Sequence, residues 1–186
     1  MLINNDTIIK DDNELVRQKS QEVTFPMSQE EKDLLLSMLK YVDDSTDEEI
    51  AIRDNLRPAV GISAIQVGVP KKMTAIVIKD ENNNKVHEYA LVNPRIVSES
   101  TEKAYLTTGE GCLSVEDEHQ GYIYRAKRVK VRGYDLLQDK MIEIKAEDYF
   151  AIVLQHELDH FKGILFYDRI NKDDPFIKLD DAVEIE

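Results

Sequence analysis

Residues 146–162 constrain this chain more than any other stretch, because they are expected to form one helix that carries His156, Glu157 and His160 as H-E-x-x-H. Residues four apart lie on one face of a helix, so the two imidazoles can bind a single metal ion. Glu157 lies beside them, where a carboxylate can exchange protons with a metal-bound water. Residues 149–154 are apolar on every side, which is typical of a buried helix and argues against an exposed helix that carries this string by coincidence. Buried histidines and acids need partners, and a metal ion is the simplest one.

The composition predicts one acidic globular domain. A chain of 186 residues is long enough to bury a real core, so residues 1–186 are expected to form a single catalytic domain. The net charge of −13 argues against a groove for DNA or another nucleic acid. No apolar run approaches the roughly 18 residues of a membrane-spanning helix, and the first residues lack the pattern of a secretory signal peptide. Cys112 is the sole cysteine, which excludes an internal disulfide. We therefore expect a cytoplasmic protein that makes no membrane contact.

Local patterns predict helices first and then a β-rich middle. Ser28 and Glu31 form a capping box at the start of a helix whose apolar residues recur at helical spacing. A short amphipathic helix is expected at residues 48–56. Six short strands then follow, at residues 73–79, 85–92, 105–107, 121–124, 128–134 and 141–145. Residues 164–170 are expected to be extended, and the tail at 176–186 is expected to supply a last edge strand. The fold class is α+β, with mostly antiparallel β-sheets packed around a central buried helix that carries H-E-x-x-H, together with N-terminal helices.

Two histidines do not hold a catalytic metal alone, because three protein ligands and one open position are usual. Downstream of His160 the chain offers only aspartates until Glu184, with no other histidine. Upstream it offers Cys112, which lies among glycines in residues 109–114. A lone cysteine is most often a small buried apolar residue. The glycine-rich setting and the missing third ligand favour Cys112 as a metal ligand.

Two motifs together resemble the peptide deformylase family. They are residues 110–114, E-G-C-L-S, and residues 155–160, Q-H-E-L-D-H. A third stretch, residues 59–66, is small and apolar and ends in Gln66, where that family has G-x-G-x-A-A-x-Q. All three occur in the family's order, and the resemblance covers roughly residues 5–186. The long connection at residues 43–59 is similar to the longer type common in Gram-positive bacteria.

The first motif departs from the family pattern at three positions. Ala59 stands where glycine is usual, Ser63 where alanine is usual, and Ile65 where the longer type often has proline. Ala59 places a methyl group near the path of a bound peptide, and Ser63 adds a hydroxyl group that must find a partner. Neither change removes a catalytic group.

The resemblance implies a metal-dependent amide hydrolase that removes the N-formyl group from the initiator N-formylmethionine of newly made polypeptides and releases formate. It implies three ligands for one divalent ion, Cys112, His156 and His160. A metal-bound water would attack the formyl carbon, with Glu157 as general base and then general acid. The side chain of Gln66 and the backbone N–H of Leu113 would donate to the developing oxyanion. The resemblance also implies Fe(2+) as the native metal, while the ligand set equally suits Zn(2+), Ni(2+) or Co(2+) in purified protein.

Helical spacing also suggests a pocket for the methionine side chain. Tyr149, Ile152 and Val153 precede His156 by seven, four and three residues, and so share its face. The other substrate-binding candidates are Val60, Gly61 and Gly111. The backbone near Gly61 could pair with the substrate as an added strand. Plain core packing is the competing interpretation for Tyr149.

Acceptors are needed for the second ring nitrogen of each metal-bound histidine. Gln155 and Asp159 are the candidates on the helix. Arg125 is a possible partner for Asp159 or for Glu110, and the sequence leaves that choice open.

Two other functions remain open at this point. A zinc peptidase built on H-E-x-x-H would need a downstream third ligand and would not need Cys112. A catalytically degenerate deformylase paralogue that only binds peptides is favoured by the altered residues at 59, 63 and 65. The expected partners are N-formylmethionyl nascent chains, and we expect a monomer. Ribosome docking is not evident from so acidic a sequence.

Overall fold

The computed structural model, which describes residues 1–186, begins its first long helix where the capping box predicts it. The side chain of Ser28 accepts from the Glu31 N–H, and the Glu31 carboxylate accepts from the Ser28 N–H. This helix, α1 (Gln29–Ser45), buries one apolar face. The short α2 (Glu48–Asp54) follows and ends at Asn55, whose φ of 56° is left-handed. No helix in the structure combines the length and apolar character that crossing a membrane requires.

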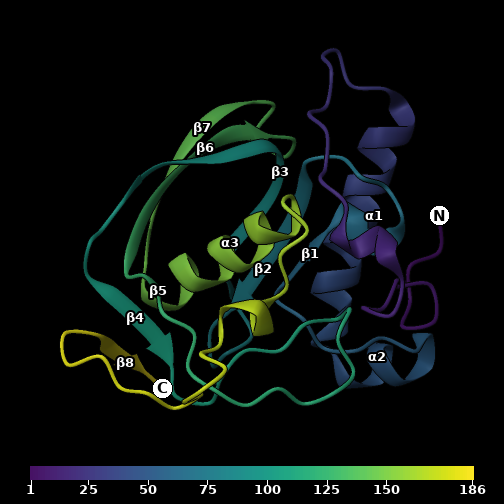
Figure 1. Cartoon of the computed structure of the whole chain (residues 1–186). Helices are drawn as coiled ribbons and strands as arrows, with labels where there is room; N and C mark the ends of the chain where they lie inside the picture. Colours follow the sequence, from purple (N-terminus) through teal and green to yellow (C-terminus); the bar gives the residue numbers. More distant parts are fainter.

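A five-stranded antiparallel sheet forms the centre of the molecule (Figure 1). Its order is β1-β2-β3-β6-β7, so β1 lies at one edge and β7 at the other. The strands are β1 (Gly61–Ser63), β2 (Met73–Lys79), β3 (Lys85–Glu99), β6 (Arg128–Asp135) and β7 (Lys140–Glu147). A smaller sheet has the order β5-β4-β8 and consists of β4 (Lys103–Leu106), β5 (Arg125–Ala126) and β8 (Val183–Ile185).

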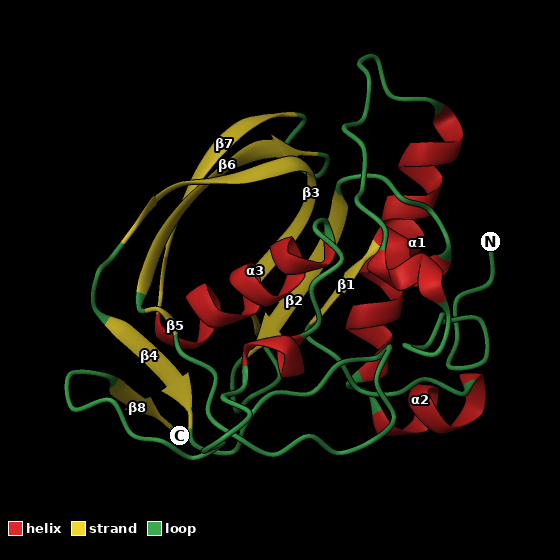
Figure 2. Ribbon diagram, viewed as in Figure 1, coloured by secondary structure: helices red, strands yellow, loops and turns green.

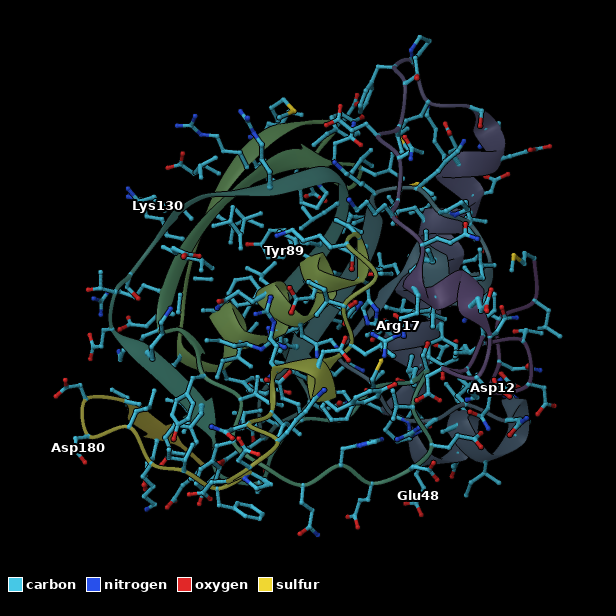
Figure 3. All side chains as sticks on the ribbon, viewed as in Figure 1. Asp12, Arg17, Glu48, Tyr89, Lys130 and Asp180 are labelled. Atoms are coloured by element: carbon cyan, nitrogen blue, oxygen red, sulfur yellow. The ribbon has the colours of Figure 1, made fainter.

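Helix α3 (Asp148–His160) lies in the concave side of the large sheet, while α1 covers the other face (Figures 1 and 2). The burial of β2 shows why both helices are needed. Met73, Ala75 and Val77 belong to the core with α1, whereas Ile76 and Ile78 belong to the core with α3. A strand that is apolar on both sides is buried only when both faces of its sheet are covered. The start of α3 is also packed by aromatic rings, because Tyr89 of β3 (labelled in Figure 3) stacks near Phe150.

The predicted fold class is confirmed, including the central buried helix, the antiparallel sheets and the N-terminal helices. Strands or helices occur near most predicted ranges, but α3 is shorter than residues 146–162 and β3 is longer than residues 85–92. The predicted strand at 121–124 is wrong, because the short β5 begins only at Arg125. The prediction that residues 164–170 are extended is also wrong, since Phe166–Arg169 form a 3₁₀ helix. The tail does supply an edge strand, which is parallel to its neighbour β4.

Candidate metal centre and active site

Three potential metal ligands converge at the C-terminal half of α3. His156 and His160 lie on the helix, and Cys112 comes from the loop that follows β4. One ligand atom from each residue lies within 4.8 Å of the other two. The Cys112 sulfur is 3.5 Å from Nε2 of His160. All three side chains are largely withdrawn from solvent. The set therefore offers one sulfur and two nitrogen donors in a dry site, which suits zinc, iron, nickel or cobalt.

The ring orientations of the two histidines fit a metal ion. Nδ1 of His156 lies 2.9 Å from Oε1 of Glu110, which fixes that ring so that Nε2 is available to a metal. His160 turns Nε2 toward Cys112, and its buried Nδ1 has no hydrogen-bond partner. The residues present thus fit the group that the motif implies, with Glu110 in the orienting role.

Buried charges tie this orienting carboxylate to the rest of the fold. Arg125 donates from Nε and Nη2 to Glu110, at 2.8 and 2.9 Å, and from Nη1 to Asp159, at 2.9 Å. The sequence left open whether Arg125 pairs with Asp159 or with Glu110, and the structure shows that it pairs with both. Arg169 also donates to both oxygens of Asp159, at 2.6 and 2.7 Å. The sequence does not indicate Arg169, because an arginine at the end of a short 3₁₀ helix carries no local signal of its partner.

This network sets the ionisation of the site. Burial opposes the ionised form of Glu110, but His156 and Arg125 outweigh it and hold the pKa of Glu110 at about 2. Burial likewise opposes the Cys112 thiolate, but the neighbouring His160 and His156 lower the pKa of that thiol to about 6. Burial lowers the pKa of His156, and its contacts with Cys112 and Glu110 outweigh this and raise it well above the usual range. Cysteine binds metals as the thiolate and histidine as the neutral ring, so an ion bound here would take the place of the proton on His156.

The Gln155 side chain makes no hydrogen bond to either imidazole. Its Oε1 accepts from the Ala126 N–H at 3.0 Å, and its Nε2 donates to the carbonyls of Ala126 and Ala151, at 2.8 and 2.9 Å. The Asp159 carboxylate is paired with Arg125 and Arg169, and it makes no hydrogen bond to either imidazole. Gln155 thus joins α3 to β5. The partner of His156 is Glu110 and not Gln155 or Asp159, while Nδ1 of His160 has no partner.

Glu157 is buried beside the candidate ligands, and it lines a pocket together with Cys112 and His156. Its carboxylate is held against strand β1. The Ser63 hydroxyl donates to Oε2 of Glu157 at 2.8 Å, so Ser63 finds the partner that its hydroxyl group requires. A Cβ atom on Gly61 would lie 2.7 Å from Oε1 of Glu157, so only glycine leaves room for the carboxylate there.

Two hydrogen-bond donors line the pocket beside the ligands. Oε1 of Gln66 accepts from the Ser63 N–H at 2.8 Å, which turns the Nε2 amide nitrogen toward the site. That nitrogen lies 3.1 Å from Oγ of Ser114 and 3.5 Å from Sγ of Cys112. The backbone N–H of Leu113 makes no hydrogen bond within the chain. Both groups can therefore donate to a negatively charged oxygen bound near Cys112.

A pocket of about 430 Å³ opens onto these groups. It is lined by every substrate-binding candidate named from the sequence, Val60, Gly61, Gly111, Tyr149, Ile152 and Val153. Ile152 and Val153 are buried, while Tyr149 is 38% exposed, so Tyr149 belongs to the pocket wall more than to the core. Ala59 also lines the pocket, as expected for a methyl group near the path of a ligand.

The fold and the site are those of an H-E-x-x-H helix whose two histidines form, with an upstream cysteine, one cluster that could hold a metal ion. The family model for polypeptide deformylase matches residues 5–176. The chain belongs to the peptide deformylase family of enzymes.

Known relatives agree with this family in sequence and in structure. A peptide deformylase of Staphylococcus epidermidis is 42% identical over 178 residues, which cover 96% of this chain and 97% of the relative. Peptide deformylase 2 of Bacillus subtilis is 40% identical over the full length of both chains. The Met-Ala-Ser-bound crystal structure of a class I type b peptide deformylase from Acinetobacter baumannii is 29% identical, with a TM-score of 0.70, and the match covers 91% of this chain and 100% of that one.

Proposed function

We propose that this enzyme hydrolyses the N-formyl group of N-formylmethionyl peptides and releases formate. The observation that carries the proposal is the convergence of the Cys112, His156 and His160 cluster with Glu157 and Gln66 at one pocket. The family membership supports the same reaction. We further propose that residues 1–186 act as a single catalytic domain in the cytoplasm, with nascent chains as substrates.

The chain's own residues account for the proton transfers and for stabilisation of charge. When bound by Cys112, His156 and His160, a divalent ion supplies Lewis-acid chemistry, which lowers the pKa of a water from about 15.7 toward about 7. Glu157 accepts a proton from the attacking water as its oxygen bonds to the formyl carbon. Glu157 then returns that proton to the amine nitrogen as the C–N bond breaks, so formate and a free amino terminus leave. Gln66 and the Leu113 N–H donate to the oxygen on which negative charge develops.

The substrate is proposed to bind along the free edge of β1. This strand pairs with β2 on one side only, because it is the edge strand of the large sheet. A peptide could add to that edge through main-chain hydrogen bonds near Gly61, which would give affinity without sequence preference. The apolar slot formed by Val60, Ile152 and Val153 would then select the methionine side chain. We propose Fe(2+) as the native metal because the resemblance to the family implies it. The donor set alone suits zinc, nickel or cobalt equally.

The test is formate release from a formyl-Met tripeptide by protein prepared without oxygen and loaded with Fe(II) or Ni(II). A Glu157→Ala sample with the same metal content is the matched control. Formate from the wild type and not from the variant is the expected result. Peptide binding without formate from metal-loaded wild type would instead establish the degenerate paralogue that only binds peptides.

A zinc peptidase is the second candidate enzyme, and Cys112 separates it from a deformylase. Cys112→Ser should lose most of its bound metal if Cys112 is a ligand, whereas a peptidase with a downstream ligand would keep it. The structure gives that alternative little support, because Asp168, the nearest downstream acid, is paired with Arg17. Metal content by elemental analysis, together with cleavage of an unformylated peptide, decides between the two.

A further inference from the structure

The carboxylate of Glu157 has one hydrogen-bond partner in the chain. Ser63 donates to Oε2 at 2.8 Å, and no lysine, arginine or backbone N–H reaches either carboxylate oxygen. Both residues are buried, since Ser63 is fully withdrawn from solvent and Glu157 is 4% exposed. A charged acceptor in so dry a place depends strongly on its single donor.

The single proton of the Ser63 hydroxyl has three possible acceptors, and the geometry favours the carboxylate. The Glu157 carbonyl oxygen is 3.1 Å away, and Oγ1 of Thr74 is 3.3 Å away. Thr74 already donates its own proton to the Ile62 carbonyl at 2.9 Å, so it can only accept from Ser63. The carboxylate oxygen at 2.8 Å is both the nearest acceptor and the charged one.

The other carboxylate oxygen lies on the pocket side. Oε1 of Glu157 packs against Gly61, which lines the pocket, and a Cβ atom at that position would come within 2.7 Å of it. Two residues of strand β1, Gly61 and Ser63, therefore fix the position of the Glu157 carboxylate. Gly61 makes room for Oε1, and Ser63 binds Oε2.

We propose that Ser63 is a positioning residue that holds Oε2 of Glu157, so that Oε1 alone carries the proton during hydrolysis. This rests on the proposed function of Glu157. If the Glu157 carboxylate could rotate, Oε1 would face the attacking water at the correct angle for only part of the time. Small misplacements of a reacting group reduce turnover strongly. Ser63 would thus act on turnover and leave substrate binding unchanged, because it does not line the pocket.

The test compares Ser63→Ala and Ser63→Thr with the wild type, all at matched metal content. Ser20→Ala is the control, because Ser20 is another buried serine whose hydroxyl group has no partner and which lies outside the pocket. We expect Ser63→Ala to lower kcat about tenfold or more with KM unchanged. Ser63→Thr, which keeps the hydroxyl group, should recover most of that loss, and Ser20→Ala should leave kcat within twofold of the wild type.

Crystal structures of the wild type and of Ser63→Ala complete the experiment, because they report the Glu157 side chain whether or not the enzyme releases formate. A carboxylate that rotates or becomes disordered in the variant supports the proposal. A kcat for Ser63→Ala within twofold of the wild type overturns it, as does a fall in thermal stability with kcat unchanged. If the wild type itself releases no formate from formyl-Met peptides, the proposed function fails. In that case the two crystal structures alone decide the role of Ser63, and an unmoved carboxylate refutes it.

Discussion

Replacement of Gln66 tests the proposed oxyanion donor most directly, because its amide is fixed at both ends. Oε1 accepts from the Ser63 N–H, and Nε2 is directed toward Ser114 and Cys112. Loss of one such donor typically raises the reaction barrier by about 2.7–4 kcal/mol, which lowers kcat roughly 100- to 1,000-fold. Gln66→Ala should therefore lose two to three orders of magnitude in turnover while its metal content stays normal.

The same variant also affects stability, and a second variant separates the two effects. Removing the amide leaves the buried Ser63 N–H unsatisfied, at a cost of about 1–3 kcal/mol in the free energy of unfolding. Alanine also leaves a cavity, whereas Gln66→Met fills most of that volume and still provides no donor. We expect an equal fall in kcat for both variants and a smaller loss of stability for the methionine variant. Formate-release kinetics and urea unfolding measure the two quantities. A kcat for Gln66→Met within tenfold of the wild type would refute the oxyanion role.

Two further predictions concern the supports of the site. Gly61→Ala places a methyl group against Oε1 of Glu157, so kcat should fall by about 100-fold with metal content unchanged; a crystal structure that shows Glu157 unmoved would contradict the reason given. Arg125→Met removes the shared partner of Glu110 and Asp159, so the free energy of unfolding should fall by about 3–5 kcal/mol. Metal affinity of that variant, measured by chelator competition, should fall about 10- to 100-fold, because Glu110 orients His156.

Features that depend on local spacing could be predicted from the sequence. The capping box of α1 joins residues three apart, and the two histidines of α3 are four apart, so helical geometry alone places each pair. Cys112 follows from the number of ligands that a catalytic metal needs and from the family resemblance. The structure brings that sulfur within 4.8 Å of a ring nitrogen of each imidazole, so one ion could be shared by the three residues.

Most features that depend on distant pairing could not be predicted, and the supports of Glu157 are the clearest case. Ser63 and Glu157 are 94 positions apart, and nothing in either segment identifies the other residue as its partner. Sequence reasoning could say that a buried hydroxyl group needs a partner, but it could not choose among the acids of the chain. Gly61 was assigned to the substrate path, and the structure adds that its missing side chain makes room for the carboxylate.

The strand predicted at residues 121–124 failed for the same physical reason. Tyr122 and Tyr124 give the alternation of a strand, but their hydrogen-bond partners lie in the tail and not in a neighbouring strand. The Tyr122 N–H donates to the Pro175 carbonyl at 2.8 Å, and the rings of both tyrosines pack on Tyr105 of β4. The tail then continues into β8, which pairs with β4 in parallel. The two tyrosine rings share one packing partner, Tyr105, so the alternation of residue types shows which side of the segment is buried. The alternation does not show which backbone supplies the hydrogen bonds of the segment.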